Sequence, residues 1–179
     1  MPVFWKIPDI NLNPKKINYC KSGIITFLLY IEVLYVNMSK MDNLFISPTQ
    51  ITPEIRLSVE ENIFRVSGTS RPEDVRALYY PVIEWIKKLS ENILNNTITV
   101  YNSENPLRFQ VDLLYFNSSS AKFLFDIFTE LNQISPSGVP VKVEWYYEKD
   151  DPDMLEAGND MSTLAEMEFT YIPKETDQI

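Results

Sequence analysis

The amino-acid sequence predicts an α/β fold, a single layered sandwich in which helices pack mainly on one face of a mixed β-sheet. Short segments with two-residue periodicity alternate with longer segments whose apolar residues recur at helical spacing, an order typical of such layers. Of the 179 residues, 45% are apolar and 23% are charged, which is ordinary for a globular domain. The length suits one domain with a single core, preceded by an N-terminal extension.

A β-hairpin is the first element that the periodicity predicts. Apolar and polar residues alternate at positions 55–59, the polar residues 60–62 favour a turn, and residues 63–67 form the returning strand. Gly68 is expected to end this strand.

The first long helix is expected to begin at a capping box. Ser70 has the side chain of a good N-cap, Pro72 suits the first turn, and Glu73 stands three residues after the cap. Apolar residues at helical spacing extend this helix to about residue 90. Pro81 lies inside it, where it removes a backbone hydrogen bond and favours a kink.

The remaining elements alternate between strand and helix. Strands are expected at residues 97–101, 109–116, 140–148 and 167–172, and helices at residues 118–134 and 153–164. The resulting order is ββαββαβαβ, with helices between consecutive strands in its second half. Such alternation predicts a mixed sheet covered by helices.

Residues 1–40 differ from the rest of the chain and mark a domain boundary near Met41. They carry a net charge of +3, whereas the rest of the chain carries −12. The apolar run 24–36 is shorter than the roughly 18–20 residues of a spanning helix. We interpret residues 1–40 as an extension that either arises from a start codon assigned too far upstream or is dispensable. The alternatives are a peripheral segment, either an anchor or an added strand, and a secretory signal. The folded domain is expected at residues 41–175.

Missing residue types exclude several kinds of catalytic chemistry. The chain contains no His, which removes Ser-His-Asp and Cys-His catalysis and imidazole metal sites. Its four glycines form neither a phosphate-binding P-loop nor a dinucleotide-binding turn. We therefore expect no cofactor, and a binding or regulatory protein rather than an enzyme.

Charge and cysteine content restrict the partners and the compartment. The net charge of −9 repels nucleic acid and anionic lipid, so neither is an expected partner. The chain has one cysteine, Cys20, which cannot form an internal disulfide and fits a reducing compartment. We expect a cytoplasmic protein.

The segment YFNSSSAK carries the functional information. Its first two residues end an apolar strand, and a helix opens at Asn117, Ser118, Ser119 and Ser120. Asn or Ser at an N-cap satisfies free backbone N–H groups, which is a purely structural role. A helix N-terminus also stabilises an anion, and three serines exceed what one cap needs. A serine hydroxyl there is a natural phosphate acceptor, because the phosphate adds charge without breaking the helix.

Three blocks of the sequence resemble a known family. They are SGTSRPEDVRALYYPVIEWIKKL at residues 67–89, YFNSSSAKFLFDIF at residues 115–128 and VEWYYEKDDPDMLEAGNDM at residues 143–161. Together they resemble the SiaC family of bacterial regulatory phosphoproteins, in the family's order and over residues 41–172. The resemblance implies a STAS-like fold and the logic of partner switches of the anti-anti-sigma-factor type.

The resemblance also implies a mode of regulation. A serine/threonine protein kinase and a PP2C-like phosphatase switch such proteins. In the best-known system the unphosphorylated form binds and activates an effector, a diguanylate cyclase, which places it in cyclic-di-GMP signalling. The family's phosphoacceptor follows the Asn of the strand-to-helix block and corresponds to Ser118, with Asn117, Ser119 and Ser120 as its supporting loop. Other members often carry Thr at this place, so this chain keeps the hydroxyl and loses the methyl.

Three side chains are candidates for partner binding. Along the helix from Ser118, Phe123 and Ile127 extend the apolar arc to roughly 200°, which is wider than packing on one sheet face requires. They lie either beneath a neighbouring helix or on a docking surface beside the phosphosite. Tyr146 points away from Trp145 on its strand and is the third candidate, because aromatic residues are enriched at interface hot spots.

The alternative function is a carboxylate- or metal-dependent hydrolase that uses the acidic segment 148–160. This segment has six acidic residues and one Lys but lacks the glycine that an EF-hand loop needs at its sixth position. An acidic loop in which Asp151 or Asp153 caps the next helix is the favoured interpretation. Asp112 and Asp126 are a conceivable acid–base pair, but their positions predict solvent exposure instead.

Overall fold

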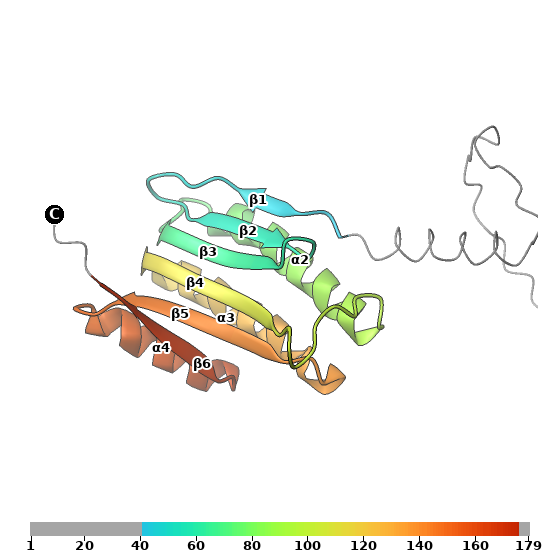
Figure 1. Ribbon diagram of the computed structural model, residues 1–179. Coiled ribbons are helices and arrows are strands. Elements are labelled where there is room, and N and C mark those ends of the chain that lie inside the picture. Colours follow the sequence, from blue (N-terminus) through green and yellow to red (C-terminus); the bar gives the residue numbers. More distant parts are fainter. Residues whose placement is uncertain (1–40, 176–179) are drawn as a thin grey trace, which may run out of the picture. The chain divides into compact units, whose positions relative to one another are not determined.

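Six strands form one sheet, and their spatial order is also their order along the chain (Figure 1). The structure, a computed structural model, describes residues 41–175. The strands are β1 (Leu44–Ile46), β2 (Glu54–Ser58), β3 (Ile63–Ser70), β4 (Leu107–Phe116), β5 (Val141–Glu148) and β6 (Phe169–Lys174). The helices are α2 (Val75–Leu94), α3 (Ser118–Asn132) and α4 (Pro152–Ala165), with a 3₁₀ turn at Ser135–Ser137.

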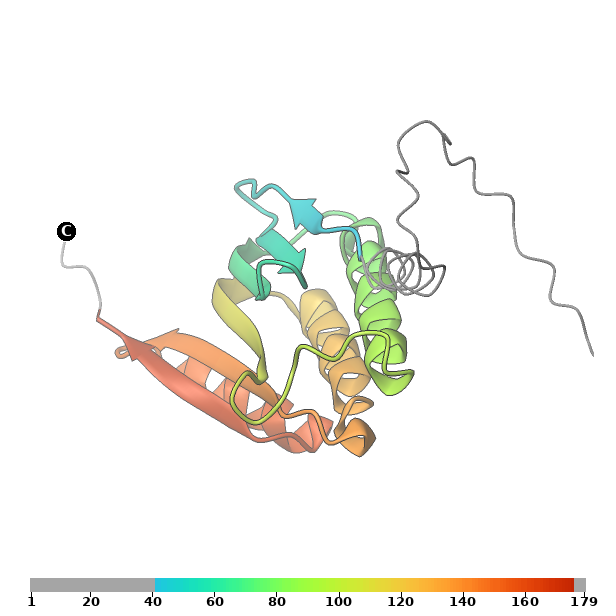
Figure 2. The ribbon, with the colours of Figure 1, turned by 45° about the vertical axis from the view of Figure 1, so that its right-hand side comes forward.

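The topology explains why the helices share one face of the sheet. Strands β1, β2 and β3 pair antiparallel, whereas β3, β4, β5 and β6 pair parallel. Each parallel connection contains one helix, and such crossovers are almost always right-handed. Because all three crossovers step in the same direction across the sheet, α2, α3 and α4 lie on the same side, and no element of residues 41–175 covers the other side (Figure 1, Figure 2).

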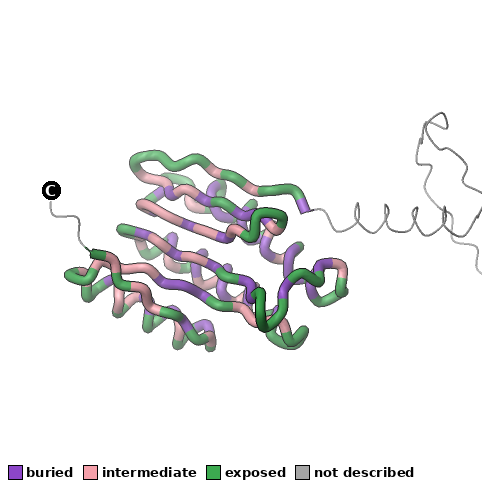
Figure 3. Tube along the Cα trace, viewed as in Figure 1, coloured by how far each residue is buried: buried purple, intermediate pink, exposed green. Residues whose placement is uncertain are grey.

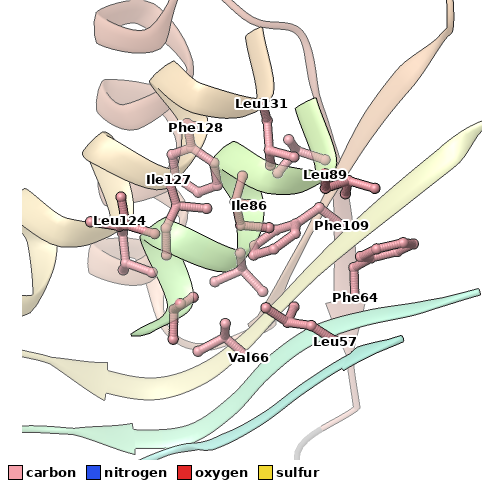
Figure 4. Close-up of a cluster of buried hydrophobic side chains, with 14 of the residues drawn as sticks. Leu57, Phe64, Val66, Ile86, Leu89, Phe109, Leu124, Ile127, Phe128 and Leu131 are labelled. Carbon is pink, nitrogen blue, oxygen red and sulfur yellow. The ribbon is translucent and has the colours of Figure 1, made fainter. Parts of the chain in front are cut away.

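The hydrophobic core lies between the helices and the covered face of the sheet. In Figure 4, Leu57 and Val66 from the strands point toward Ile86 of α2 and Ile127 of α3. All four side chains are fully buried. Burial alternates along most of β3 and β4, as two-residue periodicity requires, so that buried and less buried positions follow one another in the tube of Figure 3.

The predicted fold class is confirmed: a mixed sheet carries three helices mainly on one face. The hairpin of β2 and β3 is as expected, and the other helices and strands lie within a few residues of their predicted bounds. Two strands differ. The sequence gives no hint of β1, which has only three residues, and the segment 97–101 is not a strand. Its apolar residues Ile98 and Tyr101 are nevertheless buried, so they fill the core from a loop.

The expected capping box is wrong. Asp74, not Ser70, is the N-cap of α2, and its side chain accepts hydrogen bonds from the backbone N–H groups of Arg76 and Ala77. Gly68 does not end β3 either. It adopts a φ of +98° next to a β-bulge, and the strand continues to Ser70 because β3 pairs with the end of β4.

The expected extension at residues 1–40 lies outside the described residues, so the domain boundary near Met41 stays a prediction. Within residues 41–175, none of the helices is long and apolar enough to cross a membrane.

Candidate functional site

The candidate phosphosite lies at the carboxyl end of β4, where α3 begins. Asn117 is the N-cap of α3, and its side-chain oxygen accepts a hydrogen bond of 2.8 Å from the backbone N–H of Ser120. Ser118 and Ser119 are the first two helical residues, and both are exposed. Their backbone N–H groups point out of the helix end without an intrahelical acceptor, so an anion on either hydroxyl meets free donors and the positive end of the dipole.

Ser120, the third serine of the motif, is completely buried. Its hydroxyl accepts a hydrogen bond of 2.8 Å from Ser70 Oγ and donates one of 3.2 Å to the carbonyl oxygen of Ser70. The same carbonyl accepts the N–H of Asn117 at 3.0 Å. Ser120 is therefore an internal hydrogen-bonding residue, and the accessible hydroxyls of the motif are those of Ser118 and Ser119.

A third buried hydroxyl belongs to Tyr79 of α2. Tyr79 OH lies 2.8 Å from Ser70 Oγ, and its ring stacks on that of Phe123 with 5.6 Å between ring centroids. Burial raises the pKa of Tyr79 to about 12, although hydrogen bonds with Ser70 and Ser120 act in the opposite direction. Tyr79 thus stays protonated at physiological pH and joins α2 to the start of α3.

Two exposed apolar side chains precede the phosphosite. In the pairing of β3 with β4, Gly68 lies opposite Leu113 and Thr69 lies opposite Tyr115, so Leu114 is the extra residue of a β-bulge. Leu114 is 59% exposed and Tyr115 is 52% exposed. The sequence pattern does not single out either residue, because a regular strand alternation does not reveal a bulge that turns two consecutive side chains outward.

Of the two positions expected for Phe123 and Ile127, the structure shows the one beneath a neighbouring helix and not the docking surface. Phe123 packs against Tyr79 and Tyr80 of α2, and Ile127 is fully buried among the core side chains (Figure 4). The wide apolar arc of α3 exists because this helix contacts both the sheet and α2. Tyr146 lies on the uncovered face of the sheet, where its hydroxyl donates to Glu144, and its role in partner binding stays a prediction.

A shallow groove runs between α2 and α3 and reaches Ser119, the neighbour of the candidate phosphoacceptor Ser118. Its volume is about 560 Å³. Ser119 and Lys122 line it from α3, and Arg76, Tyr80 and Lys87 line it from α2. Tyr80 is 53% exposed and adds to the apolar surface around the start of α3.

Comparison with known proteins gives the family. The model that describes the SiaC family regulatory phosphoproteins matches residues 46–174, which includes every element from the end of β1 to β6. This chain belongs to the SiaC family. A relative from Pseudomonas aeruginosa strain UCBPP-PA14, an uncharacterised protein, is 30% identical over 109 residues, which is 61% of this chain and 79% of that protein.

Solved structures of SiaC share the fold of this SiaC family member. The crystal structure of apo-SiaC from Pseudomonas aeruginosa superposes with a TM-score of 0.59 at 27% identity, and the match covers 75% of this chain and 99% of that one. A second crystal structure from Pseudomonas aeruginosa contains the diguanylate cyclase SiaD in complex with its activator SiaC. This chain superposes on it with a TM-score of 0.60 at 26% identity, and the match covers 74% of this chain and 99% of that one. The fold of this chain is thus that of SiaC, both alone and in its complex with SiaD.

The carboxylates proposed for hydrolysis are engaged elsewhere in this SiaC-like domain. Asp112 lies on the uncovered sheet face, where its Oδ2 is 2.5 Å from Nη2 of Arg65 and its Oδ1 is 2.7 Å from Nζ of Lys174. Its side chain is only 16% exposed, so the expected solvent exposure is wrong. Burial alone would raise the pKa of Asp112, but hydrogen bonds from Lys174 and Arg65 and their positive charges lower it below its ordinary value. Asp126 instead pairs with Lys122 on α3.

The acidic segment 148–160 contains a helix cap. Asp151 is the N-cap of α4 and accepts the N–H of Met154 at 2.9 Å, and Asp153 lies in the first turn. Among residues 41–175, no three His, Cys, Asp or Glu side chains lie together as a metal site would require. The favoured interpretation of this segment, a loop followed by a capped helix, agrees with the structure.

Proposed function

We propose that this SiaC family protein is a non-enzymatic switch in the cytoplasm, controlled by phosphorylation of Ser118. In its unphosphorylated form it binds and regulates an effector, which by analogy with the SiaC–SiaD complex is a diguanylate cyclase. A serine/threonine protein kinase and a PP2C-like phosphatase set the state of Ser118. The observation that carries the proposal is an exposed hydroxyl at the start of α3, next to an exposed apolar surface.

The position of Ser118 favours it as the acceptor. Ser120 is buried and hydrogen-bonded, which removes it as a candidate in the folded protein. Ser118 directly follows the N-cap Asn117, which is the place of the family's phosphoacceptor. A phosphate there gains from the free N–H groups and the dipole of the helix, so the fold tolerates the added charge.

The neighbourhood of Ser118 explains how a phosphate would stop binding. Leu114 and Tyr115 offer apolar contact area, and burying such area stabilises a complex only if nearby charges are also satisfied. A partner that covers these side chains would dehydrate a phosphate carrying nearly two negative charges. Without a cation on the partner, that costs several kcal/mol, and each 1.4 kcal/mol is tenfold in affinity.

The proposal is tested with paired substitutions at Ser118. Ser118→Ala is expected to bind the effector constitutively and to resist the kinase, whereas Ser118→Asp is expected to bind at least tenfold more weakly with an unchanged circular-dichroism spectrum. Tandem mass spectrometry of the kinase-treated wild-type protein locates the phosphate, with Ser119→Ala as the matched control. Phosphate found only on Ser119, or tighter effector binding after phosphorylation, would contradict the proposal.

A further inference from the structure

We infer that Ser70, Tyr79 and Ser120 form a hydroxyl relay that positions Ser118 for phosphoryl transfer. The inference rests on the proposed function, because it concerns how the same acceptor is presented to the kinase. All three residues have an exposed fraction of 0%, so none of them touches the kinase directly. They come from β3, α2 and α3, which are the three elements that meet beneath the phosphosite.

The relay holds the chain on both sides of Ser118. The carbonyl oxygen of Ser70 accepts the backbone N–H of Asn117, one residue before Ser118, and the hydroxyl of Ser120, two residues after it. Asn117 in turn accepts the N–H of Ser120 through its side chain. Because both ends of this short segment are tied to one carbonyl group of the sheet, β3 determines the direction in which the Ser118 hydroxyl leaves the helix.

The hydroxyl protons of Ser70, Tyr79 and Ser120 can all be donated in hydrogen bonds within this network. Ser120 donates to the Ser70 carbonyl, Ser70 donates to Ser120 Oγ, and the remaining bond is satisfied when Tyr79 donates to Ser70 Oγ. The raised pKa of Tyr79 keeps its proton in place. Hydrogen bonds in series reinforce one another at low dielectric, so the loss of one donor weakens the others.

Phosphoryl transfer depends strongly on such positioning. The first turn of a helix frays easily, because its N–H groups lack intrahelical partners. An acceptor hydroxyl that moves by about 1 Å can lose a hundredfold in rate, since the reaction requires close approach and alignment. The relay prevents this fraying at the one turn that carries the acceptor.

The inference is tested on the full chain with Tyr79→Phe and Ser70→Ala. Tyr79→Phe removes one donor but keeps the ring that stacks on Phe123. Ser90→Ala is the matched control, because Ser90 is also buried and its hydroxyl donates to carbonyl groups of Ile86 and Glu130, which joins α2 to α3 further along both helices. The control therefore removes a comparable hydroxyl without affecting the start of α3.

The measurement is kcat and KM for phosphorylation by a serine/threonine kinase that modifies the wild-type protein, at a temperature where all variants are folded. We expect Tyr79→Phe and Ser70→Ala to lower kcat/KM at least fivefold, mainly through kcat because the docking surface is unchanged. Ser90→Ala should stay within twofold of wild type. Equal losses in Ser90→Ala and Tyr79→Phe, or wild-type rates in both relay variants, would overturn the inference while leaving Ser118 as the acceptor.

A second measurement needs no kinase and separates the inference from the proposed function. Amide hydrogen exchange at Asn117, Ser120 and Ala121, whose N–H groups are all hydrogen-bonded, reports the order of the first turn of α3. Faster exchange in Tyr79→Phe than in Ser90→Ala supports the relay, and equal exchange overturns it. If the wild-type protein is never phosphorylated at Ser118, the proposed function fails, and this comparison still decides whether the relay orders the turn.

Discussion

Gly158 of α4 packs directly against the indole ring of Trp145 in β5. A Cβ atom at position 158 would lie 2.7 Å from Nε1 of Trp145, which is closer than side chains approach in folded proteins. The same Nε1 donates a hydrogen bond of 3.0 Å to the carbonyl oxygen of Met154, one helical turn earlier. Glycine at 158 therefore lets α4 approach β5 closely enough for the fully buried Trp145 to bind the helix backbone.

Gly158→Ala is expected to destabilise the protein in spite of the better helix propensity of alanine. Overpacking a core contact of this kind costs about 1–3 kcal/mol, which exceeds the gain of about 1 kcal/mol from replacing a helical glycine. Urea unfolding followed by tryptophan fluorescence measures the difference. The exposed Glu156→Ala on the same helix is the control, and a Gly158→Ala variant as stable as the wild type would contradict the close packing.

Asp74→Ala tests which residue caps α2. Loss of this N-cap should lower the free energy of unfolding by about 1 kcal/mol, because two backbone N–H groups lose their acceptor. Glu73→Ala should change it by less than about 0.5 kcal/mol, since Glu73 is exposed and is not the reciprocal partner of a capping box here. Thermal or urea unfolding of the two variants measures the loss in the free energy of unfolding for each. A larger loss in Glu73→Ala than in Asp74→Ala would favour the capping box.

The ion pairs of Asp112 predict a dependence of stability on pH. The pKa of Asp112 is lower in the folded protein than its ordinary value of 3.8, so its stabilisation is complete above that value and disappears as the pH falls through the folded pKa. Asp112→Asn should thus cost about 1–2 kcal/mol at pH 7 and less at a pH below 3.8, where the Asp112 carboxylate begins to lose its charge. Urea unfolding at the two pH values measures this, and a difference independent of pH would contradict the assignment.

Leu114 and Tyr115 test where the effector docks. Leu114→Ser and Tyr115→Ser should leave the free energy of unfolding within about 0.5 kcal/mol of wild type, because both side chains are largely exposed. Effector binding by the unphosphorylated protein should weaken at least tenfold in isothermal titration calorimetry with the cyclase. Leu164→Ser is a matched control, since Leu164 is 65% exposed on α4. Equal weakening by the control would argue against this docking surface.

The expected domain boundary near Met41 is tested by truncation. A chain of residues 41–179 should be monodisperse and should melt within a few degrees of the full chain, since the SiaC family match begins at residue 46 and the charge changes sign near Met41. Calorimetry of both chains measures the difference. A large drop in melting temperature would show that residues 1–40 contribute to the stability of the folded domain.

Local patterns in the sequence predict most of the elements but not their partners. The segment 97–101 alternates like a strand, yet β3 and β4 pair directly with each other and leave no edge between them for it. Ile98 and Tyr101 therefore pack into the core from a loop, and Val100 is exposed. β1 has too few residues for a periodic signal and exists because β2 offers it an edge. A strand requires a neighbour, and the neighbour is decided by the whole sheet.

At the proposed phosphosite, too, local patterns predict the elements but not their partners. The sequence by itself determined that Asn117 and three serines follow a strand and open a helix, because capping and helical periodicity act over a few residues. Only the tertiary structure decided that Ser118 and Ser119 face solvent while Ser120 is buried on Ser70, a residue 50 positions earlier in the chain. Hydrogen-bond partners of buried hydroxyls are set by which strands and helices meet in space, and no local pattern encodes that meeting.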